Sequence, residues 1–255
     1  MDNFSISLNF IHMKKQDWFA NWFDTQYYHL LYQNRNEEEA KEFIQQIVAF
    51  LKLPINSKVL DLACGKGRHA QMFCQHGMQV LGVDLSPNSI AAAKQLENDK
   101  LSFSVHDMRE PIVGQKFDLI ANLFTSFGYF DAQEDNKKML HAIAQMLDKN
   151  SLLLIDFMNA KKVITNLVAA ETVQRDTLSF DISRRFDGTH IFKDIQFSDE
   201  EEDFHYTERV QALYLEDFKA LLEADFEILH TFGDFELNAF DASHSERLIL
   251  IAKRK

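Results

Sequence analysis

The chain has 255 residues, 46% hydrophobic and 26% charged, which is usual for a folded protein that buries a sizeable core. Because 39 Asp and Glu outnumber 27 Lys and Arg, the net charge is −12, which argues against nucleic acid or an anionic membrane surface as a partner. No apolar run approaches the roughly 20 residues that span a bilayer, and the two cysteines form no metal-binding set. The first residues lack a signal-peptide pattern, so we expect a cytoplasmic protein. We expect no bound metal, because the ten histidines show no HxxxH-type pairing.

Apolar residues at helical spacing predict a helix over 36–53, and strands and helices then alternate. Helices are predicted at 68–76, after Ser86 and at 131–147, and strands at 58–63, 78–85, 101–107, 117–124 and 151–159. Such alternation is typical of a parallel sheet covered by helices on both faces. A helix near 215–224 and the strands "FEILHTFG" and "ERLILIAKR" follow, and the strand connector suits a hairpin better than a parallel crossover. The predicted fold is therefore α/β: a seven-stranded, mostly parallel sheet whose last strand is antiparallel.

A second pattern interrupts this order at residues 171–212, where apolar and polar side chains alternate with a period of two. It predicts a small antiparallel β insert of three strands, with Asp187-Gly188 as a two-residue hairpin turn. In that register Arg184 faces Ile191 on the apolar side, and Lys193 lies opposite Glu208, with which it can form a cross-strand pair. Arg184 has no such partner, and a cation on a covered face needs an anion. An acidic group of a substrate or a carboxylate elsewhere in the fold would meet that need.

Acidic residues stand at three successive strand ends, where ligands of open α/β sheets bind. The first strand leads into "VLDLACGKGRHA", whose spacing Gly65-x-Gly67-x-x-Ala70 fits a dinucleotide fingerprint and hence a nicotinamide-dependent oxidoreductase. However, Asp61 lies inside that strand, and Asp84 and Asp107 end the next two. Three acids suit a ligand with a ribose, an exocyclic amine and an ammonium group better than they suit a pyrophosphate.

The motifs "VLDLACGKGRH", "GVDLS", "HDMRE" and "FDLIANLF" together resemble the successive cofactor motifs of class I (Rossmann-like) S-adenosylmethionine-dependent methyltransferases. The antiparallel closing hairpin also resembles that fold. The resemblance implies S-adenosylmethionine as cofactor, S-adenosylhomocysteine as product, and methyl transfer to a small-molecule acceptor by in-line displacement. It implies cofactor contacts for Asp61, Ala63, Gly65, Gly67, Asp84, Leu85, Asp107, Met108, Asn122 and Leu123.

Within that set, the resemblance gives the three acids different roles. Asp61 would support the ammonium group, Asp84 the ribose hydroxyls and Asp107 the adenine amine, with Met108 against the ring. The sequence departs from many relatives at Lys66 and Arg68 beside the glycines, and Arg68 either faces the ligand or points to solvent.

The segment "YYHLLYQNR" resembles the lid of sugar-amine N-methyltransferases, in which tyrosines and an arginine close over the cofactor. Tyr28, Tyr32 and Arg35 would match, with Arg35 facing the methionine carboxylate. The alternative is an amphipathic helix whose tyrosines belong to the core.

Acceptor-side residues are predicted after the fourth strand and on the insert. Phe127, Tyr129, Arg184 and Tyr206 are the substrate-binding candidates, and Tyr129 and His205 are the candidate general bases. Tyr129 as a packing residue and His205 as a solvated strand residue are equally simple, because transfer from a sulfonium needs a base only when the acceptor arrives protonated.

Four parts are therefore expected: a helical lid and first helix at 1–57, a cofactor-binding core at 58–170, the insert as a substrate cap at 171–212, and the closing helix and hairpin at 213–255. The alternatives are the nicotinamide-dependent oxidoreductase and a non-catalytic S-adenosylmethionine-binding protein.

Overall fold

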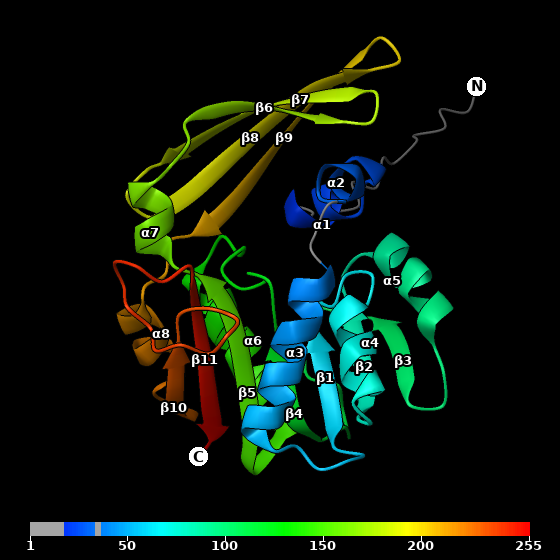
Figure 1. Cartoon of the computed structure of the whole chain (residues 1–255), viewed down its shortest axis with the longest axis vertical. Coiled ribbons are helices and arrows are strands. Elements are labelled where there is room, and N and C mark those ends of the chain that lie inside the picture. The colour runs from blue at the N-terminus through cyan, green and yellow to red at the C-terminus, as the bar shows by residue number, and fades with distance from the viewer. Residues whose placement is uncertain (1–17, 34–36) are drawn as a thin grey trace, which may run out of the picture.

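The parallel strands of the central sheet all end on the same side of the molecule, beneath α1 (Trp18–Phe23) and α2 (Gln26–Leu31) (Figure 1). The structure is a computed structural model that describes residues 18–33 and 37–255, and over these residues the sheet has seven strands in the order β10-β11-β5-β4-β1-β2-β3. β11 runs antiparallel to both β10 and β5, so the predicted sheet and its antiparallel last strand are confirmed. The strands are β1 (Lys58–Leu62), β2 (Gln79–Asp84), β3 (Leu101–Val105), β4 (Phe117–Asn122), β5 (Leu147–Met158), β10 (Phe226–Phe232) and β11 (Arg247–Arg254).

Helices cover both faces of this sheet, as the alternation predicts. One face carries α3 (Glu37–Leu51), α4 (Arg68–Gln75) and α5 (Pro87–Ala93), followed by a short 3-10 turn at Lys94–Leu96. The other carries α6 (Gln133–Met146) and α8 (Leu215–Leu222). Each helix turns an apolar stripe to the sheet, and these stripes form two separate buried clusters. At the start of α5, Ser86 accepts a hydrogen bond from the Ser89 amide at 2.9 Å, the predicted N-cap.

The short helix α7 (Ala160–Thr165) leads from the core into the insert, which is a separate antiparallel sheet in the order β6-β7-β8-β9. Its strands are β6 (Ala170–Arg175), β7 (Leu178–Phe186), β8 (His190–Asp199) and β9 (Glu202–Gln211). The prediction of three strands was wrong, because β6 is an edge strand whose mostly exposed, polar side chains give no apolar alternation.

The first turn of the insert also differs from the prediction. Phe186 pairs with Ile191, so four residues, 187–190, lie between the last paired residues of β7 and β8 instead of two. The Asp187 carboxylate accepts hydrogen bonds from the amides of Thr189 and His190, each at 2.8 Å, and so widens the turn. The register therefore shifts by two residues, and Arg184 pairs with Lys193 instead of Ile191. The predicted pairing of Lys193 with Glu208 on β9 is confirmed.

The apolar face of the insert packs against α1 and α2, which lie between the two sheets in Figure 1. Trp22 on α1 is 1% exposed and contacts the Tyr206 ring, with 4.5 Å between ring centroids. On the opposite side, Asp24 in the α1–α2 turn accepts a hydrogen bond from the Asn88 amide of α5 at 2.9 Å. The α1–α2 segment is thus held by both the core and the insert. Over the described residues, every helix is too short or too polar to cross a membrane.

Candidate active site

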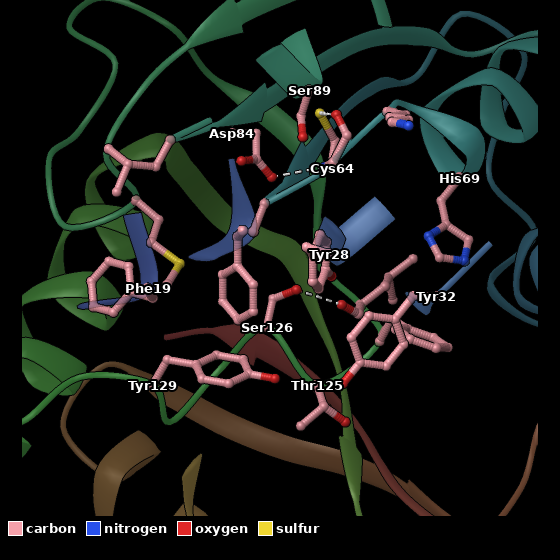
Figure 2. A pocket seen from close by; sticks show the side chains of 18 of the residues that line it. Phe19, Tyr28, Tyr32, Cys64, His69, Asp84, Ser89, Thr125, Ser126 and Tyr129 are labelled. Atoms are coloured by element: carbon pink, nitrogen blue, oxygen red, sulfur yellow. Dashed lines mark hydrogen bonds between the residues drawn. The ribbon is translucent and has the colours of Figure 1, made fainter. Parts of the chain in front are cut away.

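A cavity of about 540 Å³ lies at the carboxyl ends of β1 to β4, within the range typical of small-molecule sites. The core side of the lining includes seven of the predicted cofactor residues: Ala63, Gly65, Asp84, Leu85, Asp107, Met108 and Leu123. The roof comes from α1 and α2 and includes Phe19, Phe23, Tyr28 and Tyr32. In Figure 2, Asp84 and Cys64 lie near the top of the view and Tyr129 and Thr125 near the bottom, with Tyr28 and Ser126 between them.

The turn between β1 and α4 brings backbone to the cavity. Ala63, Gly65 and Gly67 all have positive φ angles, of 65°, 55° and 83°. A Cβ at Gly65 would meet no atom within 4 Å, so this part of the turn leaves open space beside the cavity. A Cβ at Gly67 would come within 2.5 Å of the Phe103 ring. Gly67 is therefore required by packing under the turn, whereas Ala63 and Gly65 line the cavity.

Asp61, two residues before the turn, is a buried acid without a hydrogen-bonding partner. It is 1% exposed, and among residues 18–33 and 37–255 no donor reaches either carboxylate oxygen at hydrogen-bonding distance. Burial raises the pKa of Asp61 to about 7, although the nearby Ala70 amide, which falls short of hydrogen-bonding geometry, and the charge of Arg68 act in the opposite direction. Unsatisfied buried carboxylates are uncommon, and this one calls for a cation or a donor from outside the protein.

Asp84, at the end of β2, is tied to the same turn. Its Oδ2 accepts a hydrogen bond from the Gly65 amide at 2.8 Å, and its Oδ1 accepts one from the Ser86 amide at 2.9 Å. Burial raises the pKa of Asp84, against the effect of these hydrogen bonds. The carboxylate thus links the ends of β1 and β2 and still faces the cavity.

Asp107, after β3, holds a neighbouring arginine. It accepts hydrogen bonds from the Arg109 amide at 2.9 Å and from the Arg109 guanidinium at 2.7 to 3.0 Å. Burial alone would raise the pKa of Asp107, but these bonds outweigh it and lower the pKa. Arg109 also lies over the Phe130 ring, 5.1 Å from its centroid. The sequence motif "HDMRE" contained this pair, but sequence reasoning assigned no role to the arginine.

The segment after β4 carries backbone strain next to the cavity. Phe124 and Thr125 both have φ of 59°, a left-handed conformation that non-glycine residues rarely adopt. Both line the cavity, as does Leu123. The side chain of Asn122 is fully buried instead, and its Nδ2 donates to the Leu62 carbonyl at 2.8 Å. Its predicted place near the cofactor would have to be through the backbone.

The lid residues occupy the roof. Tyr28 and Tyr32 line the cavity, whereas Arg35 lies outside the described residues. The Tyr32 hydroxyl lies 2.8 Å from both carboxylate oxygens of Glu208 on β9, and burial together with this charge raises the pKa of Tyr32 well above its usual range. Arg68 also lines the cavity. It is half-buried, and its guanidinium lies 4.9 Å from the Phe124 ring centroid, so the alternative in which Arg68 points to solvent was wrong.

The structure separates the acceptor-side candidates. Tyr129 lines the cavity and packs edge-on against Phe23, whereas Phe127 is fully buried against Phe218. His205 is exposed on the outer face of the insert, 3.6 Å from Asp194, which places it away from the cavity.

Two insert candidates are engaged within the protein. Tyr206 packs against Trp22, as described above. Arg184 forms an ion pair with Glu171 on β6 at 2.5 Å, so its anion is a carboxylate of the protein and its predicted substrate contact is not supported. The sequence could not find this partner because it did not predict β6.

Glu208 is the residue that sequence reasoning missed on the insert. It was placed on the covered face only as the partner of Lys193. In the structure it is, among the described residues of β6 to β9, the one that lines the cavity. The predicted pairing with Lys193 already put Glu208 on the covered face, and what the sequence did not show is that α1 and α2 pack on that face beside the cavity.

Comparisons with known proteins agree with this arrangement. Residues 59–150 match the family described as "Methyltransferase domain". Over 152 residues the chain is 27% identical to dTDP-3-amino-3,4,6-trideoxy-alpha-D-glucopyranose N,N-dimethyltransferase of Streptomyces venezuelae, which covers 58% of this chain and 63% of that protein. The matches span about half to two thirds of the length of the curated relatives.

Solved structures share the fold over nearly the whole chain. A S-adenosylmethionine-dependent methyltransferase from Clostridium acetobutylicum aligns with a TM-score of 0.74 and 21% identity, covering 92% of this chain and 97% of that one. The sugar N-methyltransferase KedS8 from Streptoalloteichus aligns with a TM-score of 0.69 and 21% identity, covering 89% and 92%. Residues 59–150 are therefore a methyltransferase domain, and the chain as a whole has the Rossmann-like fold of S-adenosylmethionine-dependent methyltransferases and resembles sugar-amine N-methyltransferases.

Proposed function

We propose that the protein transfers a methyl group from S-adenosylmethionine to a small-molecule acceptor. The observation that carries this proposal is the unpartnered, buried carboxylate of Asp61 on β1, which is followed in the chain by a turn that lines the cavity and leaves open space at Gly65. A cofactor with an ammonium group fits this place, because the cation would satisfy the carboxylate and the ligand could approach the bare backbone.

The remaining cofactor contacts follow from the strand ends. Asp84 would hold the ribose hydroxyls through the acceptor positions that Gly65 and Ser86 leave open. Asp107 would take the adenine amine while Arg109 orients it, and Leu85 and Met108 would pack against the ring. Arg35 as the partner of the methionine carboxylate stays a prediction.

The cofactor, when bound, supplies a methyl group already activated by its sulfonium, so alignment and exclusion of water can provide much of the rate. Phe19, Phe23 and Tyr28 roof the cavity with aromatic surface that would exclude water. Tyr129 is the candidate for orienting the acceptor, and neither it nor His205 is required as a base. The latter is placed for no direct role.

We further propose that the acceptor resembles an amino sugar, as the names of the related dimethyltransferase and of KedS8 suggest. We also propose the division into lid, core, cap and closing hairpin at the predicted boundaries, with the acceptor bound between core and cap. A cytoplasmic location, without nucleic acid as a partner, is supported by the net charge and the two free cysteines.

Calorimetry with S-adenosylmethionine, S-adenosylhomocysteine and NADH tests the cofactor. We expect both sulfur ligands to bind and to raise the melting temperature. Binding of NADH without any response to the sulfur ligands would reject the proposal. An assay for transfer of the labelled methyl group from S-adenosylmethionine to amino-sugar acceptors then distinguishes an enzyme from a protein that only binds the cofactor.

A further inference from the structure

Glu208 brings a negative charge to the acceptor side of the cavity. Its side chain is half-buried, and within the described part of the insert it is the one that reaches the cavity lining. The other acids of the lining that carry a proposed cofactor role, Asp84 and Asp107, lie at the ends of β2 and β3 on the core side. The lid and the insert therefore frame a second acidic position, opposite the one that the cofactor would use.

Two aromatic donors fix the orientation of this carboxylate. Trp22 Nε1 donates to Glu208 Oε1 at 2.7 Å, and the Tyr32 hydroxyl lies 2.8 Å from both oxygens. Lys193 Nζ donates to the Tyr32 oxygen at 2.7 Å, so the single hydroxyl proton of Tyr32 is directed to Glu208. Lys193 is thus linked to the Glu208 carboxylate through the Tyr32 hydroxyl.

Within the described part of the chain, these donors leave some acceptor positions of the Glu208 carboxylate without a hydrogen bond. An ionised carboxylate offers about four acceptor positions, and Trp22 and Tyr32 supply two hydrogens between them. Aromatic rings of the lining continue from Tyr32, which contacts Tyr28, and Tyr28 and Tyr129 both contact Phe23. A carboxylate among aromatic rings favours a cation, through both the ion pair and the ring faces. A carboxylate or phosphate group of a ligand would be repelled there.

We propose that Glu208 is the acceptor-binding carboxylate of this site and that it selects small molecules carrying a protonated amine. This inference rests on the proposed methyl transfer and assigns the insert a specificity role through an acid, in place of the predicted Arg184. The bound ammonium must release one proton to water before its nitrogen can attack, so Glu208 acts in binding and not as an obligatory base.

A latch between insert and lid is the competing interpretation, because Glu208 also joins β9 to α1 and α2. Glu208→Gln keeps one oxygen to accept from Trp22 and Tyr32 but removes the charge. Glu208→Asp keeps the charge. Glu171→Gln is the matched control, since Glu171 lies on the same face of the insert but pairs with Arg184 outside the cavity.

The test uses paired probes, glucosamine with glucose and 2-aminoethanol with ethylene glycol, titrated into protein saturated with S-adenosylhomocysteine. We expect at least one amine to bind more tightly than its hydroxyl counterpart. Glu208→Gln should weaken the binding of that amine by about tenfold to a hundredfold, the scale of losing a charged hydrogen-bond partner. Glu208→Asp should retain the preference for the amine, and Glu171→Gln should leave it unchanged.

Several results would overturn the inference while leaving the proposed function intact. The first is wild-type protein that binds S-adenosylhomocysteine but prefers neither amine over its hydroxyl counterpart. The second is an unchanged preference in Glu208→Gln. The third is an equal loss of amine binding in Glu208→Asp and Glu208→Gln, which would identify a latch. Failure of the wild-type protein to bind S-adenosylhomocysteine would instead reject the proposed function itself. Melting curves of each variant report whether the fold is kept.

Discussion

The buried carboxylate of Asp156 at the end of β5 accepts a hydrogen bond from the Phe124 amide at 2.9 Å. Its other oxygen accepts from Arg247 Nε on β11 at 2.7 Å, and Arg247 also donates to Thr125 Oγ1 at 3.1 Å. Two neighbouring strands thus hold the left-handed residues that line the cavity. The strain in Phe124 and Thr125, of order 1–2 kcal/mol for each residue, persists because this ion pair restrains them.

Asp156→Asn should therefore destabilise the protein. The change leaves the largely buried Arg247 without its anion, and breaking such a pair costs about 3–5 kcal/mol. Denaturant unfolding measures the loss. Glu216→Gln, which breaks the exposed Glu216–Lys219 pair, is the control and should change stability by less than about 1 kcal/mol. Equal effects of the two substitutions would contradict a structural role for Asp156.

Asp84→Asn should weaken cofactor binding. The carboxylate is the proposed ribose partner and also holds the Gly65 amide, so the neutral amide should cost about 1.5–3 kcal/mol of binding free energy. Calorimetry with S-adenosylhomocysteine gives the value. Asp118→Asn is a suitable control, because Asp118 accepts from the Lys58 amide near the amino end of β4, away from the cavity. Unchanged affinity in Asp84→Asn would remove Asp84 from the site.

Much of this fold follows from local sequence patterns. The parallel core is predictable because fully buried strands such as β4 and helical stripes such as that of α3 have distinct periodicities. The cofactor side of the cavity follows as well, since strand ends are sequence-local. The spacing of Gly65, Gly67 and Ala70 alone fitted a dinucleotide site too. Only the combined motifs favoured the methyltransferase interpretation, with which the match of residues 59–150 to a methyltransferase domain agrees.

The acceptor side could not be predicted in the same way. Its geometry depends on the register of the insert, and the Asp187 turn is longer than the Asp-Gly signal implies. The exposed edge strand β6 has no periodic pattern, so the partner of Arg184 was hidden. Glu208 reaches the cavity only because α1 and α2 pack between the two sheets, which is a tertiary contact that no local pattern encodes.

Asp24 should control closure of the lid segment. Its carboxylate accepts hydrogen bonds from the side chains of Ser86 and Asn88 and from the Asn88 amide, and these join the α1–α2 turn to α5. We expect Asp24→Ala to speed hydrogen exchange across residues 24–33 and to weaken cofactor binding, by about tenfold if two or more bonds are lost. In the wild type, cofactor should slow exchange in the same residues. Hydrogen-exchange rates of residues 24–33 that change neither with the cofactor nor with the substitution would contradict a lid. Glu38→Ala, on the exposed start of α3, is the control.

Asp61 should make both stability and cofactor binding depend on pH. Burial raises the pKa of Asp61 in the folded chain to about 7, well above the usual value of about 4, so between these values the folded chain holds a proton that the unfolded chain releases. The stability contributed by this group therefore falls as pH rises from about 4 to 7, and above pH 7 the buried charge costs up to a few kcal/mol. Asp61→Asn should be more stable than the wild type at pH 8, with the difference vanishing near pH 4.

Binding of an ammonium group beside Asp61 would favour the ionised form and so lower its pKa. At pH 6 to 7 the wild type should then release up to one proton when S-adenosylhomocysteine binds, which calorimetry in buffers of different ionisation enthalpy detects. Asp61→Asn should bind the ligand more weakly and without that release. Since Asp84 also has a raised pKa, Asp84→Asn serves as the comparison: proton release that survives in Asp61→Asn but disappears in Asp84→Asn would assign the titration to Asp84 and leave Asp61 without its proposed role at the ammonium group.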